Sequence, residues 1–231
     1  VDFCVPTGNF GDILAGYYAK QMGLPVGKLV CASNQNNVLT DFLSTGTYTA
    51  KREFYKTTSP SMDILVSSNL ERLLYHVTGS DAEVAGLMKS LNETGRYTVR
   101  PETLKAIQES FDCGWSSEDE VAGEIRARCE KDGYLCDTHT AVAFHVAAQK
   151  KRDGVPMVVL STASPFKFPR SVLEALGHTA PENDFEAMQA LEEATGRTAP
   201  ASLAVLRQKA ERFSTVIDPA QIAEVALSCQ A

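Results

Sequence analysis

Two glycines in the stretch VPTGNFGDILAGYYAK, residues 5 to 20, lie where a buried strand passes into a helix. Glycine at positions 8 and 11 permits a tight turn and lets the main chain approach a ligand closely. The first N–H groups of the helix have no partner within it, and they carry the positive end of its dipole. This geometry binds anions, and a phosphate monoester fits it. Asp12 stands in the same first turn, where a carboxylate stabilises the helix or orients the loop.

Taken alone, the pattern T-G-N-x-G-D also fits a turn that holds no ligand. It is neither the dinucleotide pattern G-x-G-x-x-G nor the P-loop pattern that ends in Gly-Lys-Ser/Thr. A nucleotide site is further disfavoured because the acid that would bind a ribose, expected about 20 residues after the glycines, is absent. The stretch from Ala32 to Leu39 is polar but uncharged.

Three asparagines, Asn34, Asn36 and Asn37, follow the next predicted strand, Lys28 to Ser33. Their neutral amides are candidates for binding a second phosphate, that of the substrate. Asparagine is also a leading helix N-cap residue, and both interpretations remain open for each position. Ser67, Ser68 and Asn69 pose the same choice between binding a phosphate and capping a helix, and capping of the following helix by Ser68 or Asn69 is the favoured interpretation.

His139 and Lys167 are the two remaining side chains with catalytic potential. A histidine titrates near neutral pH and suits acid/base work. His139, however, follows Asp137 at a predicted helix start, which favours capping and packing, and no Ser or Cys partner for a triad is identifiable. Lys167, in PFKF, is a candidate Schiff-base lysine because apolar neighbours lower the pKa of an amine.

The elements that position these residues alternate between strand and helix. The hydrophobic pattern predicts a strand at 2 to 6, a helix at 12 to 22, a strand at 28 to 33 and a helix at 38 to 44. Such alternation with short connections predicts an α/β fold, a parallel sheet with helices on both faces. Ligands of such sheets bind beyond the carboxyl ends of the strands, where both polar loops fall.

The rest of the chain is predicted to be mainly helical. Residues 45 to 62 are expected to form an ordered loop, and residues 81 to 131 an insertion of two or three amphipathic helices. Within that insertion, Pro101 opens one helix, and Ser117 with Glu120 forms a capping box at the start of another. The further expected elements are helices near 68–77, 138–151, 169–176, 183–195, 200–212 and 219–228, and a strand at 156–161. We therefore expect residues 1–180 to form part of one large domain, and residues 181–231 to form a carboxy-terminal helical layer.

Composition narrows the classes of partner. With 22 Lys and Arg against 29 Asp and Glu, the formal charge of −7 favours neither nucleic acid nor an anionic membrane. No apolar run reaches the roughly 20 residues that a membrane-spanning helix needs. The cysteines show no zinc-type spacing, so reduced, mostly buried thiols in a cytoplasmic protein are expected; they are Cys4, Cys31, Cys113, Cys129, Cys136 and Cys229.

Five ordered blocks resemble the threonine synthases of the bacterial and fungal type. They are VPTGNFGDILAGYYAKQMGLP, ASNQNNVLTDFLSTGTY, PSMDILVSSNLERLLY, DTHTAVAF and LSTASPFKF. The resemblance implies a fold type II pyridoxal-phosphate enzyme, similar to the tryptophan synthase β chain, that converts O-phospho-L-homoserine and water to L-threonine and phosphate. It implies that Gly8, Asn9, Phe10, Gly11 and Asp12 hold the phosphate of pyridoxal 5'-phosphate, and that Thr162 places a hydroxyl beside the pyridine nitrogen.

One part of the family pattern has no counterpart in these residues. The family's Schiff-base lysine lies upstream, in a Ser-x-Lys-Asp type segment, and Lys167 is not that lysine. We therefore expect no catalytic residue in this chain, a missing amino-terminal half as its partner, and no activity from the fragment alone. The motifs do not separate a threonine synthase from a phospholyase that releases a keto acid, or from a non-catalytic module that binds a phosphate ester, and they leave a homo-oligomer open.

Overall fold

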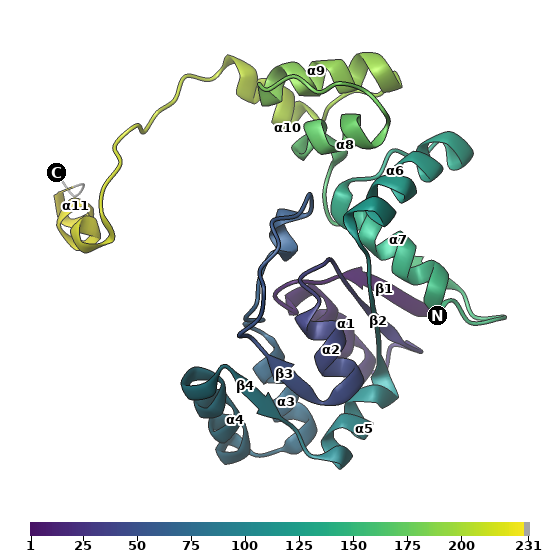
Figure 1. Cartoon of the computed structure of the whole chain (residues 1–231), viewed down its shortest axis with the longest axis vertical. Helices are drawn as coiled ribbons and strands as arrows, with labels where there is room; N and C mark the ends of the chain where they lie inside the picture. Colours follow the sequence, from purple (N-terminus) through teal and green to yellow (C-terminus); the bar gives the residue numbers. More distant parts are fainter. Residues whose placement is uncertain (229–231) are drawn as a thin grey trace. The chain divides into compact units, whose positions relative to one another are not determined.

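The chain divides into two compact units, Val1–Thr198 and Ala199–Ala231, and each is described by itself. The computed structural model describes residues 1–228, so Cys229 lies outside the described residues. Figure 1 shows the elements of both units in chain order.

Four parallel strands form the central sheet of the first unit, in the order β5-β2-β1-β6. They are β1 (Asp2–Pro6), β2 (Leu29–Ser33), β5 (Phe111–Trp115) and β6 (Met157–Val159). Every residue of β2 is buried, as is typical of a parallel strand covered on both faces. The predicted α/β class with a parallel sheet is confirmed.

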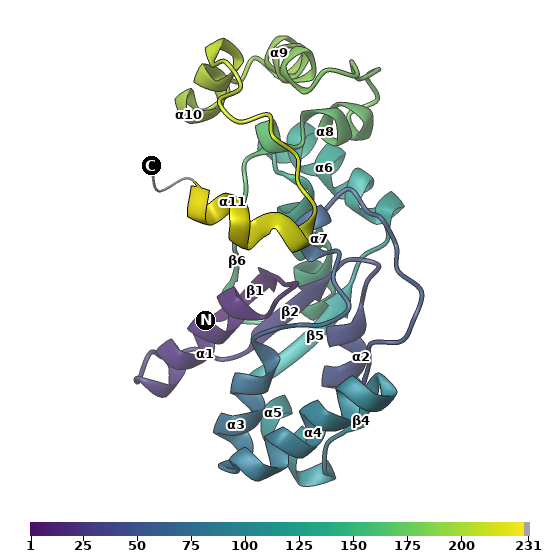
Figure 2. The ribbon, with the colours of Figure 1, turned by 90° about the vertical axis from the view of Figure 1, so that its left-hand side faces the viewer.

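The chain order explains why helices cover both faces of this sheet. Going from β1 to β2 and then to β5, the chain moves in one direction across the sheet through α1 (Gly11–Gln21) and α2 (Val38–Thr45). It returns from β5 to β6 through α7 (Thr138–Lys150), which contacts all four strands. Because crossovers between parallel strands are right-handed, the return helix must lie on the face opposite to α1 and α2. Figures 1 and 2 show this arrangement.

Strand β5 was not predicted, because it lies inside the segment expected to be a helical insertion. Its sequence, FDCGW, contains an aspartate and a glycine, which disfavour strands. Its extended conformation depends on pairing with β2, in which Cys113 lies opposite Cys31. The neighbouring helices were predicted correctly; they are α5 (Pro101–Ser110) and α6 (Glu118–Asp132), and α6 begins with the capping box of Ser117 and Glu120.

A smaller layer packs beside the sheet. The two-stranded antiparallel sheet of β3 (Thr47–Thr49) and β4 (Arg96–Thr98) is accompanied by α3 (Leu70–Thr78) and α4 (Asp81–Thr94). The rings of Tyr48 and Tyr97 stack across the two strands, with centroids 5.2 Å apart. Tyr48 also accepts a hydrogen bond from the main chain of Ser67 at 2.8 Å, so this layer anchors the loop before α3.

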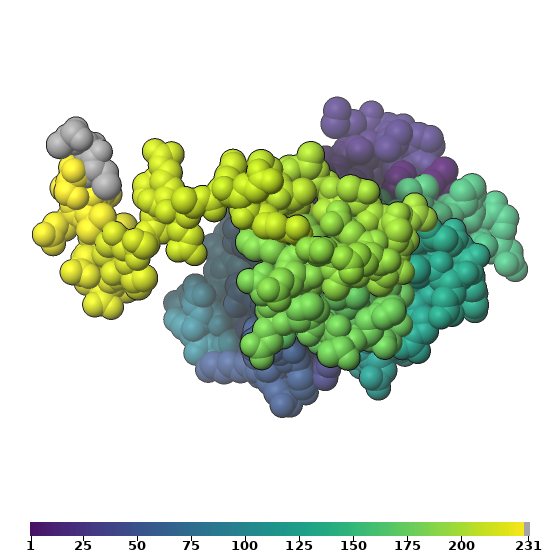
Figure 3. Space-filling view, turned by 90° about the horizontal axis from the view of Figure 1, so that it is seen from above, coloured from purple at the N-terminus to yellow at the C-terminus, as the bar shows by residue number. Residues whose placement is uncertain are grey.

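Further helices pack on α6 within the first unit. Helix α8 (Pro169–Ala175) contacts both α6 and α9 (Asp184–Thr195). The side chains of Met188 and Leu191 on α9 and of Leu173 on α8 are buried between these helices. Figure 3 shows the outer surface of this part of the first unit in green.

The second unit has little regular structure over its described residues. It comprises α10 (Ala201–Ala204), the 3₁₀ turns Val205–Gln208 and Pro219–Gln221, and α11 (Ile222–Ser228). The prediction of a helix from 200 to 212 is therefore wrong beyond residue 208. A helix this short is marginal unless an apolar face is packed, and neither α10 nor the turn after it buries a residue.

The five described cysteines are free thiols, and Cys4, Cys31, Cys113 and Cys136 are buried. Burial raises the pKa of Cys4 and of Cys136 to about 12 in each case. Among residues 1–228 there is no group of three or more metal-ligating side chains, and no helix is long and apolar enough to cross a bilayer.

Candidate functional site

The turn between β1 and α1 presents several unpaired N–H groups. Phe10 has a left-handed main chain, with φ of 66°, although it is not a glycine. Left-handed residues in such turns bring successive N–H groups to one side and form a concave anion site. Within the described residues, the main-chain N–H groups of Gly8, Asn9, Phe10 and Asp12 have no acceptor. We call residues Gly8 to Asp12 the cradle.

The carbonyl groups of the cradle are held by a second loop. Ser67 Oγ donates to the carbonyl oxygen of Gly8 at 2.9 Å. The carbonyl oxygen of Asn9 accepts from Asn69 N at 3.1 Å and from Asn69 Nδ2 at 2.9 Å. These bonds fix the carbonyl groups of the cradle. The N–H groups named above take no part in them and remain available to a ligand. The Asn9 side chain accepts from Gly11 N at 2.9 Å, which closes the turn.

Both glycines of the cradle are in tight surroundings. A Cβ atom on Gly8 would lie 3.0 Å from Met62 Cα and 3.0 Å from the carbonyl oxygen of Ser61. A Cβ atom on Gly11 would lie 3.1 Å from Asn9 Oδ1 and 3.4 Å from Asn69 Nδ2. The obstacle at Gly8 is main chain, whereas at Gly11 it is the ends of side chains. Gly8 is therefore the more constrained position.

Asp12 and Thr162 both lie beyond the ends of strands of the central sheet. The Asp12 side chain is exposed in the first turn of α1 and makes no hydrogen bond or ion pair with the described residues. Thr162 is exposed three residues beyond β6, and β6 pairs with β1. Both residues thus follow the carboxyl ends of neighbouring strands, which is the edge where α/β sheets bind ligands.

Asn34 and Asn36 are buried, and their amides build a loop. Asn34 Nδ2 donates to Asp63 Oδ1 at 2.8 Å, and Asn36 Nδ2 donates to the same oxygen at 2.9 Å. Thr57 adds two bonds to the Asp63 carboxylate, from its N at 2.9 Å and its Oγ1 at 2.6 Å. Asp63 therefore ties residues 55 to 63 to the end of β2. A substrate contact by Asn34 or Asn36 would have to compete with these bonds.

Asn37 differs from the other two asparagines. It precedes α2, but its side chain makes no capping hydrogen bond. With Gln35, Tyr55 and Trp115 it lines a cavity of about 300 Å³ at the carboxyl edge of the sheet. Of the three predicted substrate residues, Asn37 is the one that lines this cavity.

The interpretation of Ser68 or Asn69 as a helix cap is wrong. Asn69 occupies the N-cap position of α3, yet its side chain makes no capping bond. Its amide nitrogen donates to the cradle instead, and its oxygen accepts from Arg72 at 3.0 Å. The cap was expected from residue type alone, whereas the actual partner is 60 residues away in the sequence.

His139 and Lys167 have different surroundings. Asp137 caps α7, accepting from the main chain of His139 at 2.8 Å and of Thr140 at 3.2 Å. His139 is buried in that first turn, in agreement with the capping and packing interpretation. Lys167 is exposed, and its Nζ lies 5.7 Å from the centre of the Phe168 ring.

Sequence reasoning missed Asp63 and did not foresee the contacts that Ser67 and Asn69 make with the cradle. These three residues hold the two loops around it. The available signal was the block PSMDILVSSN, which contains all three within the resemblance.

Comparison with known proteins identifies the relatives of this chain. Residues 140–226 match the family described as "Threonine synthase, C-terminal". Threonine synthase from Pseudomonas aeruginosa is 42% identical over 177 residues, which are 76% of this chain and 38% of that protein. Human "Threonine synthase-like 1" is 43% identical over 178 residues, which are 76% of this chain and 24% of that protein.

Solved structures give the same result over nearly the whole chain. A pyridoxal-phosphate-bound threonine synthase from Brucella melitensis superposes with a TM-score of 0.84 at 43% identity, covering 98% of this chain and 45% of that one. Yeast threonine synthase superposes with a TM-score of 0.83 at 31% identity, covering 99% and 47%. The chain thus spans less than half the length of the relatives it matches.

Proposed function

Because this chain belongs to the threonine synthase family, we propose that its cradle holds the phosphate of pyridoxal 5'-phosphate. In this proposal, residues Gly8 to Asp12 surround the phosphate, and Thr162 places its hydroxyl beside the pyridine nitrogen. The whole protein is then a pyridoxal-phosphate-dependent lyase of threonine biosynthesis.

The observation that supports this most directly is the set of unpaired N–H groups in the cradle. Main-chain N–H groups without an acceptor are costly when they are shielded from water, and a phosphate dianion supplies several acceptors at once. The helix dipole of α1 adds a favourable field at the same point. Glycine at positions 8 and 11 leaves the space that side chains would fill.

The residues of this chain have binding and orienting roles. When bound, the cofactor supplies the electron sink that stabilises carbanions during elimination. The cradle would hold the phosphate group at one end of the cofactor. A neutral hydroxyl from Thr162 would leave the pyridine nitrogen less protonated than a carboxylate partner would. We propose that the lysine binding the cofactor's aldehyde lies in a part of the protein outside these 231 residues, so this chain alone should be inactive.

We further propose O-phospho-L-homoserine as the substrate, with L-threonine and phosphate as products. Elimination of the substrate's phosphate and addition of water at the β carbon give this outcome. Asn37 is the best placed of the predicted substrate residues, because it opens into the cavity beside Trp115. Asn34 and Asn36 would contribute by holding the loop of residues 55 to 63.

A second reaction remains an alternative proposal. Human "Threonine synthase-like 1" is 43% identical to this chain, and the Pseudomonas aeruginosa threonine synthase is 42% identical. Since these identities do not separate the two kinds of relative, a phospholyase that releases phosphate and a keto acid is the alternative. A binding module without catalysis is the third candidate.

Product analysis of the full-length protein that contains this chain tests these proposals. The protein is incubated with pyridoxal 5'-phosphate and O-phospho-L-homoserine, and phosphate, threonine and keto acid are quantified. Equal amounts of phosphate and threonine support the synthase, whereas phosphate with keto acid supports the phospholyase. Cofactor binding without phosphate release would refute both enzymes and leave the binding module.

Two broader expectations accompany this function. We propose that residues 1–180 form part of the cofactor-binding domain and residues 181–231 a carboxy-terminal helical layer. A cytoplasmic location agrees with the free thiols of the described residues, since buried free cysteines suit a reducing compartment.

A further inference from the structure

The imidazole of His139 connects the start of α7 to the turn beneath the cradle. On one side, its Nδ1 lies 3.2 Å from Asp137 Oδ1. On the other side, its Nε2 lies 3.2 Å from the main-chain nitrogen of Ser61, which is 78 residues away in the sequence. Asp137 is fully buried and His139 is 4% exposed, so water does not replace either contact.

These partners define which tautomer of the neutral ring fits the site. The main-chain N–H of Ser61 can only donate, so Nε2 must accept with its lone pair. A neutral imidazole then carries its proton on Nδ1, which faces the Asp137 carboxylate. Burial alone would raise the pKa of Asp137, but hydrogen bonds from His139 and Thr140 outweigh it and hold that pKa below its ordinary value. The carboxylate therefore stays charged and keeps the ring in this tautomer.

The turn that His139 holds is the turn that contacts Gly8. The carbonyl oxygen of Ser61 and the Cα of Met62 each lie 3.0 Å from the position a Gly8 Cβ would take. A small movement of this turn would open or close the space under the cradle. Among the described residues, the acceptor for Ser61 N is the buried side chain of His139.

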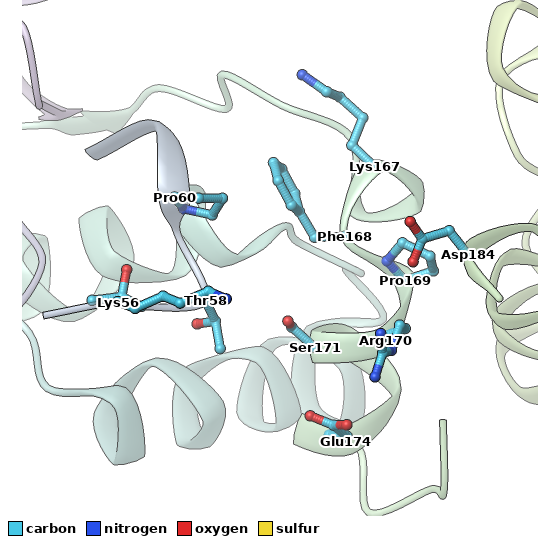
Figure 4. A pocket seen from close by; sticks show the side chains of 11 residues that line it. Lys56, Thr58, Pro60, Lys167, Phe168, Pro169, Arg170, Ser171, Glu174 and Asp184 are labelled. Atoms are coloured by element: carbon cyan, nitrogen blue, oxygen red, sulfur yellow. The ribbon is translucent and has the colours of Figure 1, made fainter. Parts of the chain in front are cut away.

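The other side of the imidazole faces an adjacent cavity wall. The ring of Phe168 packs on the ring of His139, with centroids 4.8 Å apart. Phe168 and Pro60, the residue before Ser61, both line a cavity of about 340 Å³, and Figure 4 shows them on facing walls. His139 thus contacts both the turn at Ser61 and Phe168, the residue that precedes α8.

We propose that His139 is a positioning residue that holds the Ser61–Met62 turn against Gly8 and thereby sets the geometry of the phosphate cradle. Asp137 maintains the tautomer that accepts from Ser61. The role does not involve contact with the reacting atoms. The inference rests on the proposed function, because it presumes that the cradle binds the cofactor's phosphate.

The test compares two substitutions in the full-length protein. His139→Phe keeps an aromatic ring against Phe168 but has no acceptor for Ser61 N. His139→Gln loses the ring but places a side-chain oxygen near the position of Nε2. Dissociation constants are measured for pyridoxal 5'-phosphate and for pyridoxal, which lacks the phosphate. The ratio of the two constants isolates the contribution of the cradle from general damage to the protein.

In His139→Phe, the preference for the phosphorylated form should fall about five- to tenfold, the size of effect that one lost hydrogen bond produces. In His139→Gln, the preference for the phosphorylated form should remain within about twofold of the wild-type value, because the side chain still offers an acceptor to Ser61 N. The ³¹P chemical shift of the bound cofactor should move in His139→Phe and stay near the wild-type value in His139→Gln. If His139→Phe does not fold by circular dichroism, His139→Leu provides a second acceptor-free side chain.

An unchanged ratio of the two dissociation constants in either acceptor-free variant would overturn the inference. If both ligands bind equally more weakly, the role of His139 is a general structural one. A different result would refute the proposed function itself: a wild-type protein that binds pyridoxal and pyridoxal 5'-phosphate equally well has no phosphate cradle. The two failures are therefore distinguishable in the same set of measurements.

Discussion

Replacing Gly8 by alanine should damage the cradle more than the same replacement at Gly11, its other glycine. The new Cβ would lie 3.0 Å from two main-chain atoms, Met62 Cα and the carbonyl oxygen of Ser61. Neither atom can rotate away as a side chain can, so the turn must move. In the same loop, Gly11→Ala meets only the ends of the Asn9 and Asn69 side chains, which can adjust.

The cost follows from this difference. Forcing an extra methyl group into a packed site costs about 1–3 kcal/mol, and Gly8→Ala should reach the upper part of that range. Gly11→Ala should cost less than about 1 kcal/mol, because alanine favours the helix that begins there. The matched control is Gly86, inside α4, where a Cβ would meet nothing within 4 Å. Gly86→Ala should raise the free energy of unfolding by about 0.5–1 kcal/mol through helix propensity.

Urea unfolding of the cofactor-free full-length protein measures the three free energies, and titration with pyridoxal 5'-phosphate measures the affinity. We expect Gly8→Ala to lower both stability and affinity, Gly11→Ala to lower mainly affinity, and Gly86→Ala to leave affinity unchanged. The reasoning would be refuted if Gly8→Ala were as stable as the wild type and bound the cofactor equally well, since the turn would then have yielded at no cost.

Three further predictions concern residues away from the cradle's own main chain. Asp63→Ala removes the acceptor shared by Asn34 and Asn36 and should lower the free energy of unfolding in urea by about 2–3 kcal/mol. A loss below about 0.5 kcal/mol, the smallest effect expected of one hydrogen bond, would contradict the assigned role. The hydrogen bonds from Arg152 hold the pKa of buried Asp2 below its ordinary value of 3.8, so the pair stabilises the fold above that pH and loses its effect as the pH falls through the lowered value. Arg152→Gln should therefore lower the free energy of unfolding at pH 7, and the difference from wild type should vanish as the pH falls through the lowered pKa of Asp2. A difference independent of pH would argue against the pair. Iodoacetamide at about pH 8, followed by peptide mapping, should label half-buried Cys129 before Cys4, because burial raises the pKa of the Cys4 thiol to about 12. The reverse order would contradict the packing of β1.

The sequence predicted the strand, turn and helix around the cradle because each carries a local signal. A short apolar run marks β1, apolar residues at helical spacing mark α1, and two glycines mark the turn between them. The left-handed conformation of Phe10 has no such signal, since a bulky residue rarely adopts positive φ. Its conformation is imposed by packing, because its side chain is fully buried and lies 5.5 Å from the ring of Phe111.

The supporting loops could be located but not explained from the sequence. The asparagines after β2 were correctly expected at the carboxyl edge of the sheet, since strand order places them there. Their partner Asp63 lies 27 and 29 residues away, beyond the reach of any periodic pattern. Asn69 likewise bonds to Asn9 rather than to its own helix. Contacts of this kind depend on how loops meet in space, which local propensity does not encode.

Phe10 joins two functions in one residue. Its N–H faces the proposed phosphate site, while its ring is fully buried in the hydrophobic core against Phe111. A change in the core near Phe111 would therefore alter ligand affinity without touching the ligand. Conversely, a ligand bound to the cradle stabilises the native state by mass action. Heat resistance and cofactor occupancy are thus thermodynamically coupled, and selection for one of them acts on the other.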